Sequence, residues 1–136
     1  MEQTVTSDQE RRSVILVVEH VEETRYGIER LLTASGYRVS TARDEEEAIQ
    51  KASLHRPDLI LISPGLDAVQ LLPVGRRIRE RAGLEEKVPV VVFCVASLNE
   101  SDEVAAGDNI YMTWPDIFDQ LRALLSRLLR KLPRAG

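Results

Sequence analysis

Five side chains that could do chemistry stand directly after apolar stretches of the sequence: Glu19 and His20, Ser63, Cys94, and Trp114. Glu19 offers a carboxylate, and the imidazole of His20 and the thiol of Cys94 are ligands that zinc accepts, although their spacing matches no recognised zinc motif. Ser63 offers a neutral hydroxyl, which is a weak nucleophile unless a base activates it, and His20 is the base candidate. These residue types leave open a metal- or redox-sensing site and a modified serine.

The elements that must position these side chains follow a regular alternation. Short apolar runs alternate with longer amphipathic segments, which is typical of βα units that build a parallel sheet with helices on both faces. Five strands are expected, at 14–18, 37–42, 59–62, 88–95 and 109–112. The helices between and after them are expected at about 28–35, 44–54, 67–80, 97–106 and 117–132.

Two of the expected helices have irregular sequences. Pro73 and Gly75 interrupt the third helix, which predicts a late start or a distorted first turn. The fourth, at 97–106, is short and polar, and its apolar face is thin. By contrast, Asp44 followed by Glu47 resembles a capping box, so the second helix should have a well-defined beginning.

Length and composition fit one globular domain. The chain has 136 residues, 43% of them hydrophobic, which is enough to bury a core and too short for a second domain. We expect a flexible arm at 1–12, a single domain at 13–132 and a tail at 133–136. With 22 acidic and 18 basic residues the formal charge is -4, which argues against nucleic-acid or membrane binding and favours protein partners.

Cysteine usage and hydropathy indicate the compartment. The single cysteine, Cys94, cannot form an internal disulfide. The sequence shows no signal peptide and no apolar run long enough to cross a membrane. The expected location is therefore the cytoplasm.

The candidate side chains lie at or just after the ends of expected strands, and this placement predicts one common site. In open α/β sheets, ligands bind outside the carboxyl ends of the strands, near the point where the strand order reverses. The loops after the first, third, fourth and fifth expected strands carry the five residues. We therefore expect these four loops to converge.

Four stretches of the sequence resemble the signature segments of response-regulator receiver domains: VILVVEH, RPDLILIS, VPVVVFC and NIYMTWP. The resemblance extends from Ser13 to about Lys131. It implies a CheY-like, flavodoxin-like α/β fold, in which a five-stranded parallel sheet of order 2-1-3-4-5 forms the middle of a three-layer α/β/α sandwich.

In that family an acidic pair binds magnesium, an aspartate accepts a phosphoryl group, and a threonine or serine and a lysine complete the site. The matching positions here hold Glu19 with His20, then Ser63, Cys94 and Trp114. Magnesium prefers hard oxygen ligands, so its binding should be weak or absent. A serine cannot form the family's acyl phosphate, and an indole has no charge to pair with phosphate. The chain thus resembles a degenerate, or pseudo-receiver, subgroup with no catalytic residue, metal or cofactor, and no enzyme activity is expected.

The resemblance also implies a role. Tyr111 matches the family's switch aromatic, which shapes the face formed by the fourth helix, fifth strand and fifth helix. We expect a module of two-component or phosphorelay signalling that binds proteins independently of phosphorylation. A histidine kinase, a downstream effector or a second copy in a homodimer are the expected partners. The alternatives are a metal or redox sensor using His20 and Cys94, a receiver phosphorylated at a residue other than aspartate, and a small-molecule binder.

Overall fold

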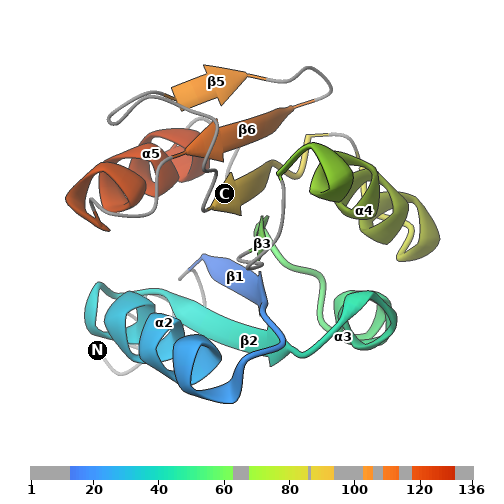
Figure 1. The fold of residues 1–136 in the computed structure, drawn as a ribbon, viewed down its shortest axis with the longest axis horizontal. Coiled ribbons are helices and arrows are strands. Elements are labelled where there is room, and N and C mark those ends of the chain that lie inside the picture. Colours follow the sequence, from blue (N-terminus) through green and yellow to red (C-terminus); the bar gives the residue numbers. More distant parts are fainter. Residues whose placement is uncertain are drawn as a thin grey trace, which may run out of the picture.

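The computed structural model describes residues 13–62, 68–85, 87–93, 103–105, 109–113 and 118–130. The expected N-terminal arm at 1–12 and C-terminal tail at 133–136 lie outside these residues. The described elements form one sheet with helices on both of its faces (Figure 1). Their bounds agree with the βα alternation of the sequence, with one exception in the second half of the chain.

The sheet has six strands in the order β2-β1-β3-β4-β6-β5. Five of them run parallel: β2 (Arg38–Ala42), β1 (Val14–Val18), β3 (Leu59–Ile62), β4 (Val90–Phe93) and β6 (Ile110–Thr113). These five correspond to the predicted order 2-1-3-4-5, so the predicted flavodoxin-like fold is confirmed.

The sixth strand corrects one prediction. β5 (Glu103–Ala105) pairs antiparallel with β6, inside the segment 97–106 where the sequence pattern predicted a helix. Residues 97–102 and 106 of that predicted helix lie outside the described residues. A helix needs an apolar stripe to pack against the sheet, and this segment has too few apolar residues to supply one. As a strand beside β6, the backbone N–H and C=O groups of this segment can form hydrogen bonds with an edge that would otherwise be unpaired. Pairing at the sheet edge therefore outweighs the weak helical pattern at these residues.

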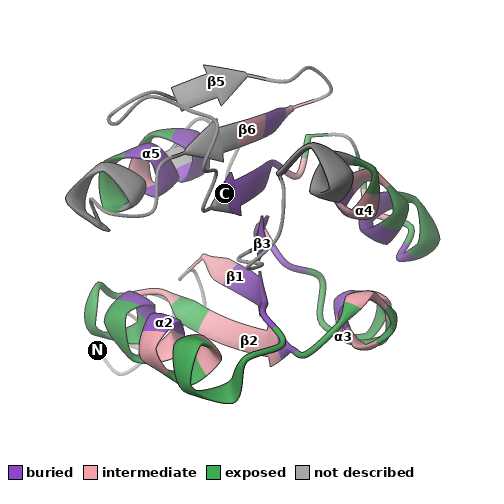
Figure 2. Ribbon diagram, in the orientation of Figure 1, coloured by how far each residue is buried: buried purple, intermediate pink, exposed green. Residues whose placement is uncertain are grey.

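Helices cover both faces of the sheet, as Figure 1 shows. α2 (Glu22–Ala34) and α5 (Phe118–Arg130) lie on one face, where Ile28, Leu32, Leu124 and Leu125 pack with inward residues of β1, β3 and β4. α3 (Glu45–Leu54) and α4 (Ala68–Arg81) lie on the other face. Figure 2 shows that the central strands β1 and β3 are buried almost throughout, as continuous aliphatic runs predict for strands covered on both sides.

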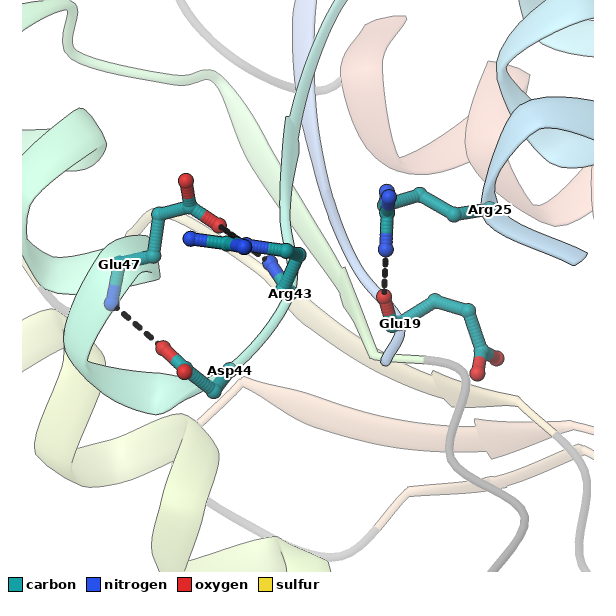
Figure 3. A network of polar contacts seen from close by, with 5 residues as sticks. All are labelled: Glu19, Arg25, Arg43, Asp44 and Glu47. Atoms are coloured by element: carbon teal, nitrogen blue, oxygen red, sulfur yellow. Dashed lines mark hydrogen bonds and ion pairs between the residues drawn. The ribbon is translucent and has the colours of Figure 1, made fainter. Parts of the chain in front are cut away.

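Half of the predicted capping box at the start of α3 is present, and the return contact goes to Arg43, one residue before the N-cap residue Asp44. The Asp44 carboxylate accepts a hydrogen bond from the Glu47 backbone N–H at 2.8 Å. Glu47 in turn reaches back, and its carboxylate accepts from the Arg43 backbone N–H at 2.7 Å. These contacts satisfy N–H groups that have no partner inside the helix, which fixes the point where β2 turns into α3 (Figure 3).

α4 lies unusually close to the sheet. The helix begins at Ala68 and continues through Pro73, so the expected late start does not occur. A Cβ atom placed on Gly75 would lie 2.7 Å from Cγ1 of Val90 in β4. The glycine is therefore required by packing, because any side chain at this position would push the helix away from the strand.

An ion pair joins α4 to α3 on the same face of the sheet. The Arg77 guanidinium donates two hydrogen bonds to the Glu45 carboxylate, at 2.7 and 2.8 Å. This bidentate geometry lowers the pKa of Glu45 and raises the pKa of Arg77. The pair fixes the spacing of the two helices at the surface.

Candidate functional site

The carboxyl ends of four parallel strands lie side by side. Val18 at the end of β1 is in register with Ile62 at the end of β3. Further along the sheet, Phe93 at the end of β4 is in register with Thr113 at the end of β6. The residues that come next in the chain are Glu19, Ser63, Cys94 and Trp114, so their strands end at one edge of the sheet, as the sequence predicted.

The structure describes two of the five candidate residues. Glu19 and His20 are described, whereas Ser63, Cys94 and Trp114 lie outside the described residues. The convergence of all five side chains therefore stays a prediction. What the structure establishes is the frame that carries them and the environment of the two that follow β1.

Glu19 is held by three separate contacts and is only 4% exposed. Its backbone N–H donates to the carbonyl oxygen of Ala42 at 3.0 Å, which extends the pairing of β1 with β2. Its own carbonyl oxygen accepts from Arg25 Nη1 at 3.0 Å (Figure 3). Its carboxylate Oε2 accepts from the backbone N–H of Val21 at 2.9 Å.

The carboxylate contact gives Glu19 a structural role at the start of α2. Val21 is the N-cap residue of this helix, and its side chain makes no capping hydrogen bond. Glu19 supplies an acceptor from two residues earlier and places a negative charge near the positive end of the helix dipole. The buried acid is thus occupied in shaping the turn between β1 and α2, which its position in the sequence alone did not reveal.

His20 points into solvent beside this buried acid. Its side chain is 65% exposed, and Nδ1 lies 3.6 Å from Glu19 Oε2, beyond hydrogen-bonding distance. Across the described ranges, with their gaps after residues 62, 85, 93, 105 and 113, no group of three or more histidine, cysteine or acidic side chains is placed to hold a metal ion. Of these two residues only Glu19 offers the oxygen ligands that magnesium prefers, and weak or absent magnesium binding stays a prediction.

Tyr111 occupies the middle of β6, in register with Val91 of β4 and Ala105 of β5. Its ring is half-buried and packs against the core on the α2 and α5 face. Its hydroxyl donates to Asn109 Oδ1 at 2.9 Å. Because Asn109 precedes it by two residues, the ring leans toward the amino end of β6 and away from the edge where Trp114 follows. Its role as a switch stays a prediction.

Asn109 is the residue that sequence reasoning missed. It has a positive φ of 61°, a conformation that asparagine tolerates better than other residues with a Cβ atom. Its Nδ2 donates to the carbonyl oxygen of Lys87 at 3.0 Å, and its own carbonyl oxygen accepts from Val90 N–H at 3.1 Å. In the sequence, the asparagine directly before a short apolar strand was the feature that could have indicated this role.

The other resolved electrostatic effects lie at the start of α3. The Arg43 backbone N–H is the main cause of the lowered pKa of Glu47, with a further contribution from the Arg43 side chain. Both these contacts and the Arg77 contact of Glu45 belong to the anchoring of α3. None of the helices described is both long enough and apolar enough to cross a membrane.

Comparison with known proteins identifies relatives along most of the chain. A family model described as response regulator receiver domain matches residues 15–111. The transcriptional regulatory protein PrrA of Mycobacterium tuberculosis is 34% identical over 123 residues, covering 86% of this chain and 50% of that protein. The response regulator ArlR of Staphylococcus aureus is 28% identical, covering 88% of this chain and 54% of that protein. The chain thus spans about half the length of these curated relatives.

Solved structures agree with this match. The receiver domain of the sensor histidine kinase PA1611 from Pseudomonas aeruginosa, with a magnesium ion coordinated in its active-site cleft, superimposes with a TM-score of 0.63. It is 27% identical and covers 88% of this chain and 99% of that one. A receiver domain of a histidine kinase from Syntrophus aciditrophicus gives a TM-score of 0.67 at 23% identity, covering 91% and 95%, and supports the fold alone.

Proposed function

The chain belongs to the response-regulator receiver domain family, and from this premise we propose that it is a pseudo-receiver, which signals by binding proteins and accepts no phosphoryl group. Its partners would be signalling proteins, such as a histidine kinase or a downstream effector, or a second copy of the chain. The proposal concerns this receiver unit alone, and not the longer relatives, of which it matches about half the length.

The observation that carries the proposal is the residue after β3. This strand ends at Ile62, and the next residue in the chain is Ser63. A phosphoryl group transferred to a carboxylate gives a reactive acyl phosphate, whereas a serine hydroxyl is neutral and needs a base for activation. Trp114, which follows β6, has one N–H donor and no charge to balance a phosphoryl group.

The environment of Glu19 gives independent support. The acid after β1, Glu19, accepts a hydrogen bond from Val21 N–H through its Oε2. Binding a metal through the same oxygen would compete with this contact at the start of α2. The exposed imidazole of His20 adds a nitrogen ligand that magnesium disfavours.

The test is the intact mass of the protein after incubation with acetyl phosphate and magnesium. We expect no phosphoryl adduct on the folded wild-type chain. The matched comparison is the triple variant His20→Asp, Ser63→Asp and Trp114→Lys, which restores an acidic pair, a carboxylate after β3 and a cation after β6. An acid-labile adduct on the triple variant shows that the scaffold and the assay are competent.

One result would overturn the proposal. A phosphoryl adduct on the wild-type chain that disappears in Ser63→Ala would make Ser63 a phosphorylation site. Its stability in acid would then identify a phosphoserine, and the chain would be a receiver phosphorylated at a residue other than aspartate.

A further inference from the structure

We propose that Asn109 is a latch that holds Tyr111 in one position, pointing away from the carboxyl edge of the sheet. This inference rests on the proposed function, because it explains how the face beside β6 keeps a fixed shape without a phosphoryl signal. In this role Asn109 is a positioning residue for Tyr111.

The amide of Asn109 joins two parts of the chain. Oδ1 accepts from the Tyr111 hydroxyl at 2.9 Å, and Nδ2 donates to the carbonyl oxygen of Lys87 at 3.0 Å. The chemistry fixes this orientation, because the reversed amide would place its oxygen against the Lys87 carbonyl oxygen. Asn109 therefore connects the Tyr111 hydroxyl to the segment that leads into β4.

The backbone of Asn109 holds its side chain in place. Its φ of 61° lies in the left-handed region, and its carbonyl oxygen accepts from Val90 N–H at 3.1 Å at the first residue of β4. Asn109 is thus bonded to β4 by its main chain and to Lys87, before β4, by its side chain.

The direction of the ring follows from the register of β6. Asn109 directly precedes β6, so the bond from the Tyr111 hydroxyl to its amide aligns the ring along β6 toward the amino end of the strand. The opposite end of the strand is Thr113, in register with Phe93. The face of the ring is fixed by packing against the α2 and α5 core. A change at the carboxyl edge can reorient Tyr111 only if its bond to Asn109 breaks.

A double-mutant cycle tests the latch in the folded chain. Tyr111→Phe removes the hydroxyl and keeps the ring, and Asn109→Gly removes the amide and keeps a residue that accepts positive φ. Loss of one neutral hydrogen bond predicts that Tyr111→Phe lowers the folding equilibrium constant about fivefold in the wild-type background. In the Asn109→Gly background the same change should have an effect of less than about twofold.

Tyr26 supplies the matched control. It is exposed on α2, so Tyr26→Phe should have the same effect in both backgrounds. Equal effects of Tyr111→Phe in the two backgrounds would overturn the latch. If Asn109→Gly does not fold, Asn109→Asp gives a second test, because its carboxylate still accepts from Tyr111 but cannot donate to Lys87. In the Asn109→Asp background Tyr111→Phe should keep its full wild-type effect, and loss of that effect would overturn the latch.

Ring signals in NMR spectra test the consequence directly. With labelled tyrosine, Asn109→Gly should shift and broaden the Tyr111 ring signals and leave those of Tyr26 and Tyr37 unchanged. Addition of beryllofluoride and magnesium to the wild-type protein should leave Tyr111 unchanged. A response there would refute the phosphate-blind function even if the cycle shows coupling. Absence of coupling would refute the latch even if the protein ignores beryllofluoride.

Discussion

Replacing Gly75 by alanine should destabilise the protein, although alanine is the better helix former. In an exposed helix interior, the change from glycine to alanine stabilises by about 1 kcal/mol. Here the new Cβ would lie 2.7 Å from Cγ1 of Val90, which is fully buried in β4 and cannot move aside freely. Overpacking of a core costs about 1–3 kcal/mol, so after the helix gain of about 1 kcal/mol a net loss of up to about 2 kcal/mol is expected.

The assay is denaturant unfolding of matched variants, compared at equal m-values. Gly27 in α2 is the control, because a Cβ there would meet no described atom within 4 Å. Gly27→Ala should therefore stabilise by about 0.5–1 kcal/mol. In a Val90→Ala background the clashing methyl group is gone, and Gly75→Ala should become neutral or stabilising. If Gly75→Ala stabilises the wild-type protein as Gly27→Ala does, the close approach of α4 to β4 is refuted.

Three further predictions concern polar contacts at helix ends. Because Arg77 lowers the pKa of Glu45, this pair stabilises the fold at neutral pH. The stabilisation is lost as the pH falls through the folded-state pKa of Glu45, which lies below 4.5. In Glu45→Gln the free energy of unfolding should therefore fall less steeply with acid pH. Asp44→Ala should cost about 1 kcal/mol in chemical unfolding, because it removes the cap of α3. Glu19→Ala should cost about 1–3 kcal/mol by leaving a backbone N–H without its acceptor, whereas Glu19→Gln retains an acceptor oxygen and most of the stability.

One result would contradict each of these predictions. For the ion pair, that result is a Glu45→Gln variant whose stability falls with acid pH as the wild-type stability does. Glu46→Gln, on the exposed side of α3, is the comparison. For the cap it is an Asp44→Ala variant as stable as wild type. For Glu19 it is an equal loss in the alanine and glutamine variants, which would show that charge, and not the hydrogen-bond acceptor, is what stabilises the turn.

The strands at the centre of the fold were predictable because their sequences allow few other structures. The aliphatic runs at Val14–Val18 and Leu59–Ile62 contain no polar residue, and both are buried strands in the structure. The start of α3 was predictable as well, because the capping contact between Asp44 and Glu47 involves residues three apart. In both cases the determining interactions are local or depend on composition alone.

Other features depend on contacts that local sequence does not contain. β5 forms because the edge of β6 is available, and the short segment Glu103–Ala105 does not encode that availability. The burial of Glu19 follows from its backbone bond to Ala42, far away in the chain. The sequence identified Glu19 as a candidate site residue, but it did not predict that its carboxylate accepts a hydrogen bond in the turn into α2.

The antiparallel strand β5 has a consequence for how freely this region can vary. Every parallel pair in the sheet joins segments separated by a crossover, whereas β5 and β6 pair as near neighbours, with Ala105 in register with Tyr111. An insertion between β5 and β6 would lengthen the connection between two neighbouring strands and leave the pairing of β1, β3 and β4 unchanged. This end of the sheet can therefore accumulate changes in length and sequence that the central strands, buried on both faces, could not accept.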